Sequence, residues 1–287
     1  MTVGAMALLF TCCVIWGGNI VAIKISNRGF DPVFTAAVRS AAAALLLFLY
    51  ALVTHTKLRV HGRVLLYGFI ISIFFALEFF FLFWGTKYTL ASRATILLYT
   101  SPFWVALGAH FMLREKLSVG RMAGLALAFA GVVAVFAAGT GLGKGHLLGD
   151  LMELVAAVFW AANTLFSKRF MSRVSMTPFQ LLFYQVLFSA PLLFVSSLIF
   201  EGLPHVTWRL DATLSVVYQA VVIVTITYMA WFWILQRHQA GHVAAFAFFT
   251  PLFGVVMAGV FLGDPLPWLI WVGVATVAGG IYLVNRR

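Results

Sequence analysis

The chain is dominated by uninterrupted apolar runs of about 20 residues, the length that a helix needs to cross a bilayer. Short connections that carry most of the charges, prolines and glycines separate these runs. Only 9% of the residues are charged, whereas soluble domains carry about 25%. Backbone groups in hydrocarbon must be hydrogen-bonded within the protein, and the runs lack the alternation of barrel strands, so we expect helices. The sequence therefore predicts an all-α integral membrane protein.

Ten such runs predict ten transmembrane helices. They cover residues 5–25, 33–53, 64–84, 94–112, 121–139, 149–169, 179–199, 214–235, 243–262 and 268–284. An even number of spans puts both termini on one side of the membrane. The basic residues on that side are Lys57, Arg59, Arg63, Arg114, Lys116, Arg121, Lys168, Arg169, Arg173, Arg237, Arg286 and Arg287, and those on the other side are Lys24, Arg28, Lys87, Arg93, Lys144 and Arg209. Because basic connections stay in the cytoplasm, we expect both termini there, in a bacterial inner membrane.

The charges and motifs exclude several other classes of protein. The net charge of +11 does not indicate nucleic acid, because the basic residues sit in short connections and no folded basic face presents them. No HExxH or GxSxG motif and no metal-ligand spacing of Cys or His occurs. The glycine-rich run 139–145 lacks the spacing and the Ser or Thr of a phosphate-binding loop, so it reads as a flexible link. We expect no enzyme activity, metal or cofactor, and transport driven by a gradient.

The second half of the chain repeats the first, at offsets of 144, then 146, then 149 residues. The pairs are Trp16 and Trp160, Asn19 and Asn163, Lys24 and Lys168, Pro32 and Pro178, Arg39 and Gln185, Trp84 and Trp233, Ala91 and Ala240, Pro102 and Pro251, Glu115 and Asp264, Gly124 and Gly273, and Gly131 and Gly280. Loop insertions produce offsets that change only between helices. The pattern is typical of a duplicated helical unit.

Five spans per half is an odd number, so the second half enters the bilayer from the opposite side. We therefore predict two inverted five-helix repeats, residues 1–139 and 149–287, joined by a linker at 140–148 and arranged around a central cavity. Secondary transporters share this design, in which one half rocks against the other around a site near the membrane midplane.

Each half ends with a proline-bearing helix, an acidic turn and a glycine-spaced helix. The acidic turns are residues 113–117 and 262–266. Together with Trp-Gly-Gly-Asn at 16–19, they resemble the EamA family of the drug/metabolite transporter superfamily over essentially the whole chain. The resemblance implies a ten-helix bundle, a cavity walled by the first four helices of each half, the fifth and tenth helices packed outside, and export of small metabolites. Within that superfamily the chain looks most like the YddG-type exporters of aromatic amino acids.

Several side chains inside the predicted spans are candidates for binding a substrate. They are Trp16, Asn19, Glu78, Thr95, Tyr99, Trp160, Asn163 and Tyr228. Asn19 and Asn163 are repeat mates, each one turn from a Trp. An Asn at this depth needs a hydrogen-bond partner, which is either another helix or a substrate. Aromatic residues make up 16% of the chain and favour a cavity for apolar or aromatic ligands.

Glu78 and Arg39 are ionisable groups inside predicted spans, each costing about 2.5–3.5 kcal/mol to insert. At 1.5 Å per residue, both lie roughly 10 Å from the same surface, so they are placed to pair. They are either a gate or anchors for the ammonium and carboxylate of a substrate. The structural alternatives are an ion pair between two helices, or an Arg39 side chain that snorkels to the headgroups. Pro102 and Pro251 are expected to kink their helices, in a gating or structural role.

These features predict a secondary transporter that exports aromatic or neutral amino acids and related metabolites from the cytoplasm by alternating access. A broad exporter of drugs or sugar derivatives with the same fold is the alternative within transport. An intramembrane enzyme or lipid-handling protein is the alternative of another class, and it predicts catalytic residues clustered at one face, which the sequence lacks. The expected partners are a small molecule and the lipid bilayer, with the oligomeric state and coupling ion left open.

Overall fold

The computed structural model describes residues 2–58, 62–113, 119–138, 144–174 and 176–285, and these form helices and turns with one isolated bridge between Phe30 and Val206. The helices are α1 (Val3–Ser26), α2 (Pro32–Val53), α3 (Gly62–Tyr88), α4 (Ala91–Leu98), α5 (Ser101–Leu113), α6 (Val119–Ala138), α7 (Lys144–Arg173), α8 (Pro178–Phe200), α9 (Leu210–Tyr218), η1 (Gln219–Thr227), α10 (Tyr228–Arg237), α11 (Ala240–Phe246), η2 (Ala247–Phe249), α12 (Thr250–Leu262) and α13 (Trp268–Asn285). The first acidic turn, at Glu115, lies outside the described residues.

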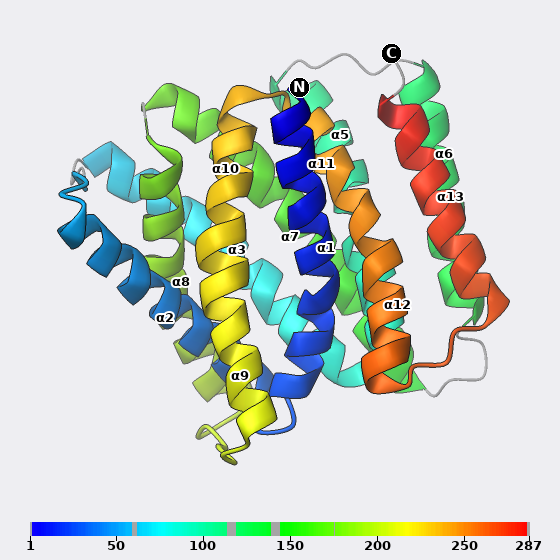
Figure 1. The fold of residues 1–287 in the computed structure, drawn as a ribbon, viewed down its shortest axis with the longest axis horizontal. Helices are drawn as coiled ribbons and strands as arrows, with labels where there is room; N and C mark the ends of the chain where they lie inside the picture. Colours follow the sequence, from blue (N-terminus) through cyan, green and yellow to red (C-terminus); the bar gives the residue numbers. More distant parts are fainter. Residues whose placement is uncertain (1, 59–61, 114–118, 139–143, 175, 286–287) are drawn as a thin grey trace.

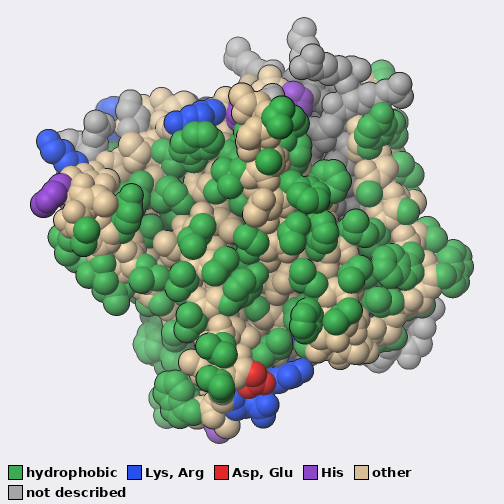
Figure 2. All heavy atoms as spheres, viewed as in Figure 1, with side chains coloured by type: hydrophobic (Ala, Val, Ile, Leu, Met, Phe, Trp, Pro, Cys, Tyr) green, Lys and Arg blue, Asp and Glu red, His purple; other side chains and the backbone are tan. Residues whose placement is uncertain are grey.

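Seven helical stretches within the described residues are long and apolar enough to cross a membrane. They are Val3–Ser26, Pro32–Val53, Gly62–Tyr88, Ala91–Leu113, His146–Arg173, Pro178–Phe200 and Leu210–Arg237. The remaining predicted spans, 121–139, 243–262 and 268–284, fall on shorter apolar helices. Figure 2 shows apolar side chains over the flank of the molecule, with Lys and Arg near its two ends. The prediction of an all-helical protein suited to a membrane is confirmed.

The helices alternate in direction along the bundle (Figure 1). α1 begins and α13 ends at the same end, here called the terminal end, and the opposite end is called the distal end. α6 packs on α13 at one edge of the molecule, and α3 packs on α7, α2 on α8 and α1 on α12. α7 begins at Lys144, so residues 144–148 of the predicted linker are helical.

Carboxylates from the second half cap helices of the first half at the distal end. The N–H groups of Val33 and Phe34, which begin α2, donate to the carboxylate of Glu201 over 2.9 and 3.0 Å. The N–H and hydroxyl of Ser92 donate to Asp264 over 2.8 and 3.0 Å at the start of α4. A carboxylate there satisfies unpaired N–H groups and complements the helix dipole. Both caps therefore tie the two halves together.

A buried ion pair closes the same end. The guanidinium of Arg93 in α4 pairs with Asp150 in α7, and the two side chains are 4% and 1% exposed. The hydroxyl of Thr89 donates to the same carboxylate over 2.5 Å. The helices meet through glycines here, since a Cβ at Gly149 would lie 2.8 Å from the carbonyl oxygen of Gly85. We call this contact of α7 with α3 and α4 at the distal end the distal seam. It is both tightly packed and ionic.

The terminal end is held differently, by basic side chains on carbonyl groups. The ammonium of Lys168 in α7 donates to carbonyl oxygens at the end of α10, including Leu235 at 2.7 Å and His238 at 2.8 Å. Arg169 donates to the carbonyl oxygen of Met112 over 3.3 Å. Cations favour helix C-termini, where carbonyl groups lack intrahelical partners. These contacts join α7 to α5 and α10 without a buried carboxylate.

Replacing Asp150 by Asn is expected to destabilise the protein, because it leaves Arg93 buried without a counter-charge, a change that costs about 3–5 kcal/mol. The measurement is the midpoint of thermal unfolding in detergent. Asp211→Asn, which breaks an exposed pair with Arg209 at the same end, is the control and should leave the midpoint unchanged. The double replacement Arg93→Met with Asp150→Leu should recover much of the loss. An unchanged midpoint in Asp150→Asn would contradict this account.

Candidate functional site

Two small adjoining cavities lie between α1, α3, α7 and the rod formed by α9, η1 and α10. Each has a volume of about 10 Å³, room for about one water molecule. Seven of the eight candidate substrate residues line them: Trp16, Asn19, Glu78, Tyr99, Trp160, Asn163 and Tyr228. The structure therefore brings residues from both halves of the sequence to one enclosed place.

Six aromatic side chains line these cavities. One is Phe232, and we call the other five the aromatic cluster: Trp16, Tyr99, Trp160, Tyr228 and Trp231. The repeat mates Trp16 and Trp160 lie edge to face with ring centroids 5.9 Å apart. Trp16 also lies 5.9 Å from Tyr228 and 5.3 Å from Trp231, and Tyr99 lies 5.0 Å from Trp160. Such geometry adds about 0.5–1.5 kcal/mol per ring pair beyond the area that is buried. A flat apolar group is the ligand that this cluster would accept.

Unpaired polar atoms lie beside the aromatic cluster. Glu78 is 3% exposed, and its side chain lines one cavity together with that of Asn163. One carboxylate oxygen of Glu78 and the amide oxygen of Asn19 are buried without a hydrogen-bond partner. Leaving a buried acceptor unpaired costs about 1–3 kcal/mol. The site is therefore suited to a ligand that brings hydrogen-bond donors.

Arg39 does not form the expected pair with Glu78. No ion pair joins them within the described residues, and no nitrogen of the Arg39 guanidinium has a hydrogen-bond partner. Its central carbon instead lies 3.7 Å from the ring centroid of Phe79 and 4.8 Å from that of Phe83. The snorkelling alternative is wrong, because the side chain is 0% exposed. Cation–π contact holds the charge in place and leaves its hydrogen-bond donors unused.

The position of Arg39 has a polar counterpart in the second half. Its repeat mate, Gln185 in α8, is also 0% exposed, and neither polar atom of its amide has a partner. Each half thus places a buried and unsatisfied polar side chain early in its second helix. Only the first half makes that side chain a cation.

Thr95, the eighth candidate, lines neither cavity and packs between helices. Its hydroxyl donates to the carbonyl oxygen of Ala91 over 2.7 Å. A Cβ at Gly254 in α12 would lie 2.4 Å from the Thr95 methyl, and one at Gly17 in α1 would lie 2.6 Å from the Cβ of Phe253. The helix α12 therefore approaches both α1 and α4 closely. The glycine pair of α1 serves this contact, and α1 continues unbroken through it.

The prolines follow interruptions in their helices. The helix α4 ends at Leu98, and Pro102 lies in the first turn of α5. The 3₁₀ turn η2 precedes α12, and Pro251 lies in the first turn of that helix. Proline costs no hydrogen bond there, because the first N–H groups of a helix have no partner. Their gating role stays a prediction.

Six residues that line the cavities were not predicted. They are Leu82, Leu98, Thr164, Ile223, Trp231 and Phe232. Helical spacing gives a signal for some of them, since Leu82 lies one turn from Glu78, and Trp231 and Phe232 lie three and four residues from Tyr228. Nothing in the sequence indicated Ile223.

Ile223 lies in η1, a nine-residue π-helix between α9 and α10. The hydroxyl of Thr225 donates to the carbonyl oxygen of Ala220, five residues earlier. At the end of η1, Thr227 accepts a 2.6 Å hydrogen bond from the indole N–H of Trp16. Thr227, the repeat mate of Glu78, therefore contacts the aromatic cluster without lining the cavities. π-helical segments are rare and concentrate at functional sites.

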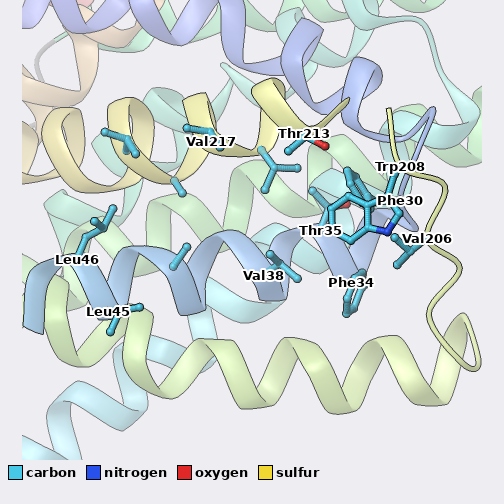
Figure 3. A pocket seen from close by; sticks show the side chains of 14 residues that line it. Phe30, Phe34, Thr35, Val38, Leu45, Leu46, Val206, Trp208, Thr213 and Val217 are labelled. Carbon is cyan, nitrogen blue, oxygen red and sulfur yellow. The ribbon is translucent and has the colours of Figure 1, made fainter. Parts of the chain in front are cut away.

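A much larger cavity than these two lies on the flank, between described residues. It measures about 480 Å³ and runs between α2 and the rod formed by α9 and η1. Figure 3 shows Val38 and Leu45 of α2 opposite Val217 of α9, with Phe30 and Trp208 toward one end. None of the candidate residues lines it, and its walls are apolar apart from two threonine hydroxyls. It offers no group that would bind the charged part of an amino acid.

The apolar helices and the polar pocket enclosed between them define a multi-pass membrane protein. The sequence model of the "EamA-like transporter family" matches residues 3–137 and 147–286 of the chain. The chain belongs to this family, and the family prediction is confirmed.

Relatives align over nearly the whole chain. Over 98% of its length it is 32% identical to a Salmonella typhimurium protein named "Probable amino-acid metabolite efflux pump", 93% of which is covered. The Escherichia coli protein of the same name is 29% identical, with the same two shares covered. A Bacillus subtilis protein, "Uncharacterized transporter YoaV", is 26% identical over 98% of this chain and 96% of its own. A crystal structure at 20% identity shares the fold, with a TM-score of 0.75 over 99% of this chain and 97% of the other.

Gly254→Ala is expected to lower stability by about 1–3 kcal/mol, because the added methyl overpacks the contact between α12 and Thr95. Adding Thr95→Ser, which removes the clashing methyl, should restore most of the loss. Gly4→Ala, where a Cβ meets nothing within 4 Å, is the control and should not destabilise. Thermal unfolding of the purified protein measures all three. Equal midpoints in Gly254→Ala and the unaltered chain would show that α4 and α12 are not in close contact.

Proposed function

We propose that this protein exports aromatic and other neutral amino acids across a bacterial inner membrane by alternating access between two inverted five-helix halves. One observation carries the proposal. A closed site combines an aromatic cluster with buried polar atoms that have no partner in the protein, on Glu78 and Asn19. The two efflux-pump relatives align with the whole chain, which supports an amino-acid-related substrate.

The recognition follows from charge and shape. The substrate ammonium would donate to Glu78 and Asn19, supplying the hydrogen bonds that these oxygens lack. The substrate carboxylate would accept from Arg39, which acts electrostatically on Glu78 although the two do not touch. A side chain such as that of phenylalanine would pack against the rings of Trp16 and Trp160. Arg39 does not line the present cavities, so binding would require a small shift of α2 or α3.

Several observations support two inverted halves. The family match falls in two stretches of similar length. α2 packs on α8 and α6 on α13, so each of these helices packs against its own repeat mate. α1 runs from the terminal to the distal end, whereas α7 runs the other way (Figure 1). A two-fold axis in the membrane plane would place the mates Trp16 and Trp160 side by side, as they lie here.

The proposed cycle begins from this closed form. Each cavity has room for about one water, far less than an amino acid needs, so one end must open to admit substrate. The bias of basic residues supports a cytoplasmic terminal end. Opening there would load the site, and opening of the distal seam would release the substrate.

Counterflow into proteoliposomes tests the proposal, with labelled phenylalanine, methionine and threonine. We expect exchange of phenylalanine, and a loss of about tenfold or more in apparent affinity for Glu78→Gln, because a charge-assisted hydrogen bond is worth about 1.5–3 kcal/mol. Asp211→Asn is the matched control and should leave exchange unchanged.

Substrate analogues that lack one charged group test the roles of Arg39 and Glu78 separately. Arg39→Met should lose the preference for phenylalanine over phenethylamine, which lacks the carboxylate. Glu78→Gln should lose the preference for phenylalanine over phenylpropionate, which lacks the ammonium. If the unaltered protein exchanges no amino acid, the proposed substrate is wrong, and competition by drugs or sugar derivatives would then favour the broader exporter.

A further inference from the structure

Glu153 in α7 is a buried acid that the proposed transport site does not use. It is 0% exposed, and both of its carboxylate oxygens lack a hydrogen-bond partner. A Cβ at Gly85 of α3 would lie 3.0 Å from one of these oxygens. The carboxyl group is therefore held within the tight crossing of α3 and α7, between the two halves of the chain.

The surrounding charges do not neutralise Glu153. On its own helix, the carboxylate of Asp150 acts on it with the same sign and is already paired with Arg93 of α4. The positive charge of Lys24 in α1 attracts the carboxylate of Glu153, but no ion pair joins the two within the described residues. Lys24 also interacts electrostatically with Asp264.

The remaining elements packed against α7 near this point supply little charge. Lys87 of α3 is exposed at the distal end, and Asp264, after α12, is engaged by the N–H and hydroxyl of Ser92. A bare carboxylate without donors is costly to bury, and taking up a proton removes that cost. The neutral form therefore suits the closed seam.

Opening the distal end would reverse this preference. α3 and α7 belong to different halves, so separating the halves there would bring water to Glu153 and solvate the ionised form. We propose that Glu153 is a proton-binding site of the distal seam, neutral when the seam is closed and ionised when it is open. Each closing would take one proton from the adjoining water, and each opening would return it. Proton binding and closure then favour each other to the same extent.

The site is specific to one end of the molecule. At the offset of 144 that relates α1 to α7, the repeat mate of Glu153 is Leu9, which is 1% exposed. The terminal end has an apolar side chain where the distal end has an acid. Of these two repeat mates, only the distal one can therefore bind a proton. This inference rests on the proposed alternation of access, but it requires no particular substrate.

The labelling rate of a single cysteine placed at the distal seam measures how often the seam opens. Ala91, which is 0% exposed and precedes Ser92 in α4, is replaced by Cys in a chain carrying Cys12→Ala and Cys13→Ala. The full-length protein in nanodiscs is labelled with a fluorescent maleimide between pH 5.5 and 8.5. A second chain with Leu203→Cys, at a distal position 88% exposed, corrects for the pH dependence of the thiol reaction. The readout is the ratio of the two labelling rates.

We expect this ratio to rise by about threefold or more with pH, since a group that binds a proton in only one state shifts the equilibrium by up to about tenfold per pH unit. Glu153→Gln, a neutral mimic, should keep the ratio low and constant. Glu201→Gln alters a distal acid whose oxygens accept hydrogen bonds, and the rise should persist in it. A constant ratio in the chain with Glu153 intact, a rise that persists in Glu153→Gln, or a rise lost in Glu78→Gln instead would each overturn the proposal.

Hydrogen–deuterium exchange of residues 85–93, corrected for intrinsic pH dependence, repeats the test without the seam cysteine. It covers the case in which Ala91→Cys does not fold. Neither readout needs a substrate. If no amino acid shows counterflow but the opening of the seam depends on pH, the proposed substrate is refuted and the role of Glu153 stays supported. Counterflow with a pH-independent seam would refute the role of Glu153 alone.

Discussion

Hydrocarbon offers no hydrogen bonds, so every polar side chain between these helices either finds a partner in the protein or raises the free energy of the folded state. The described polar groups divide accordingly. Asp150 is paired with Arg93, and Glu201 caps a helix. Glu78 and Arg39, by contrast, have buried polar atoms without partners. Paired groups hold the bundle together, whereas the unpaired atoms raise the free energy of this closed form.

The sequence repeat accounts for the framework of the site but not for its charges. The mates Trp16 and Trp160 meet at the cavities. The charged residues break the symmetry, because Glu78 has Thr227 as its mate and Arg39 has Gln185. Two equivalent ends suit a machine that opens alternately, since both closures then have similar geometry. A substrate with a distinct ammonium and carboxylate needs an asymmetric site, which a perfect duplication would not provide.

Hydropathy and the sequence repeat predicted most of the features that depend on one helix at a time, such as where a helix lies in the sequence. The apolar runs located the helices to within a few residues, and seven of the eight candidate substrate residues line the cavities. Contacts between helices could not be predicted in this way. Thr95 faces Gly254 and not the cavity, and no local pattern states which helix will approach that face. Arg39 has aromatic rings where a carboxylate was expected. The π-helix η1 shifts the register of a rod whose sequence reads as an ordinary span, which is why Ile223 was not foreseen.

The cost of the unpaired atoms bears on how transport is tied to conformation. A ligand shifts an equilibrium only by its difference in affinity between the two states. In an open form, water would solvate Glu78 and Arg39, so a substrate would gain little by replacing it. In the closed form, these groups have polar atoms without partners in the protein. A substrate that hydrogen-bonds to those atoms would offset the full cost of their desolvation. In a closed form widened enough to hold a substrate, the binding energy would be concentrated there, and this would favour closure around a substrate over closure of an empty site.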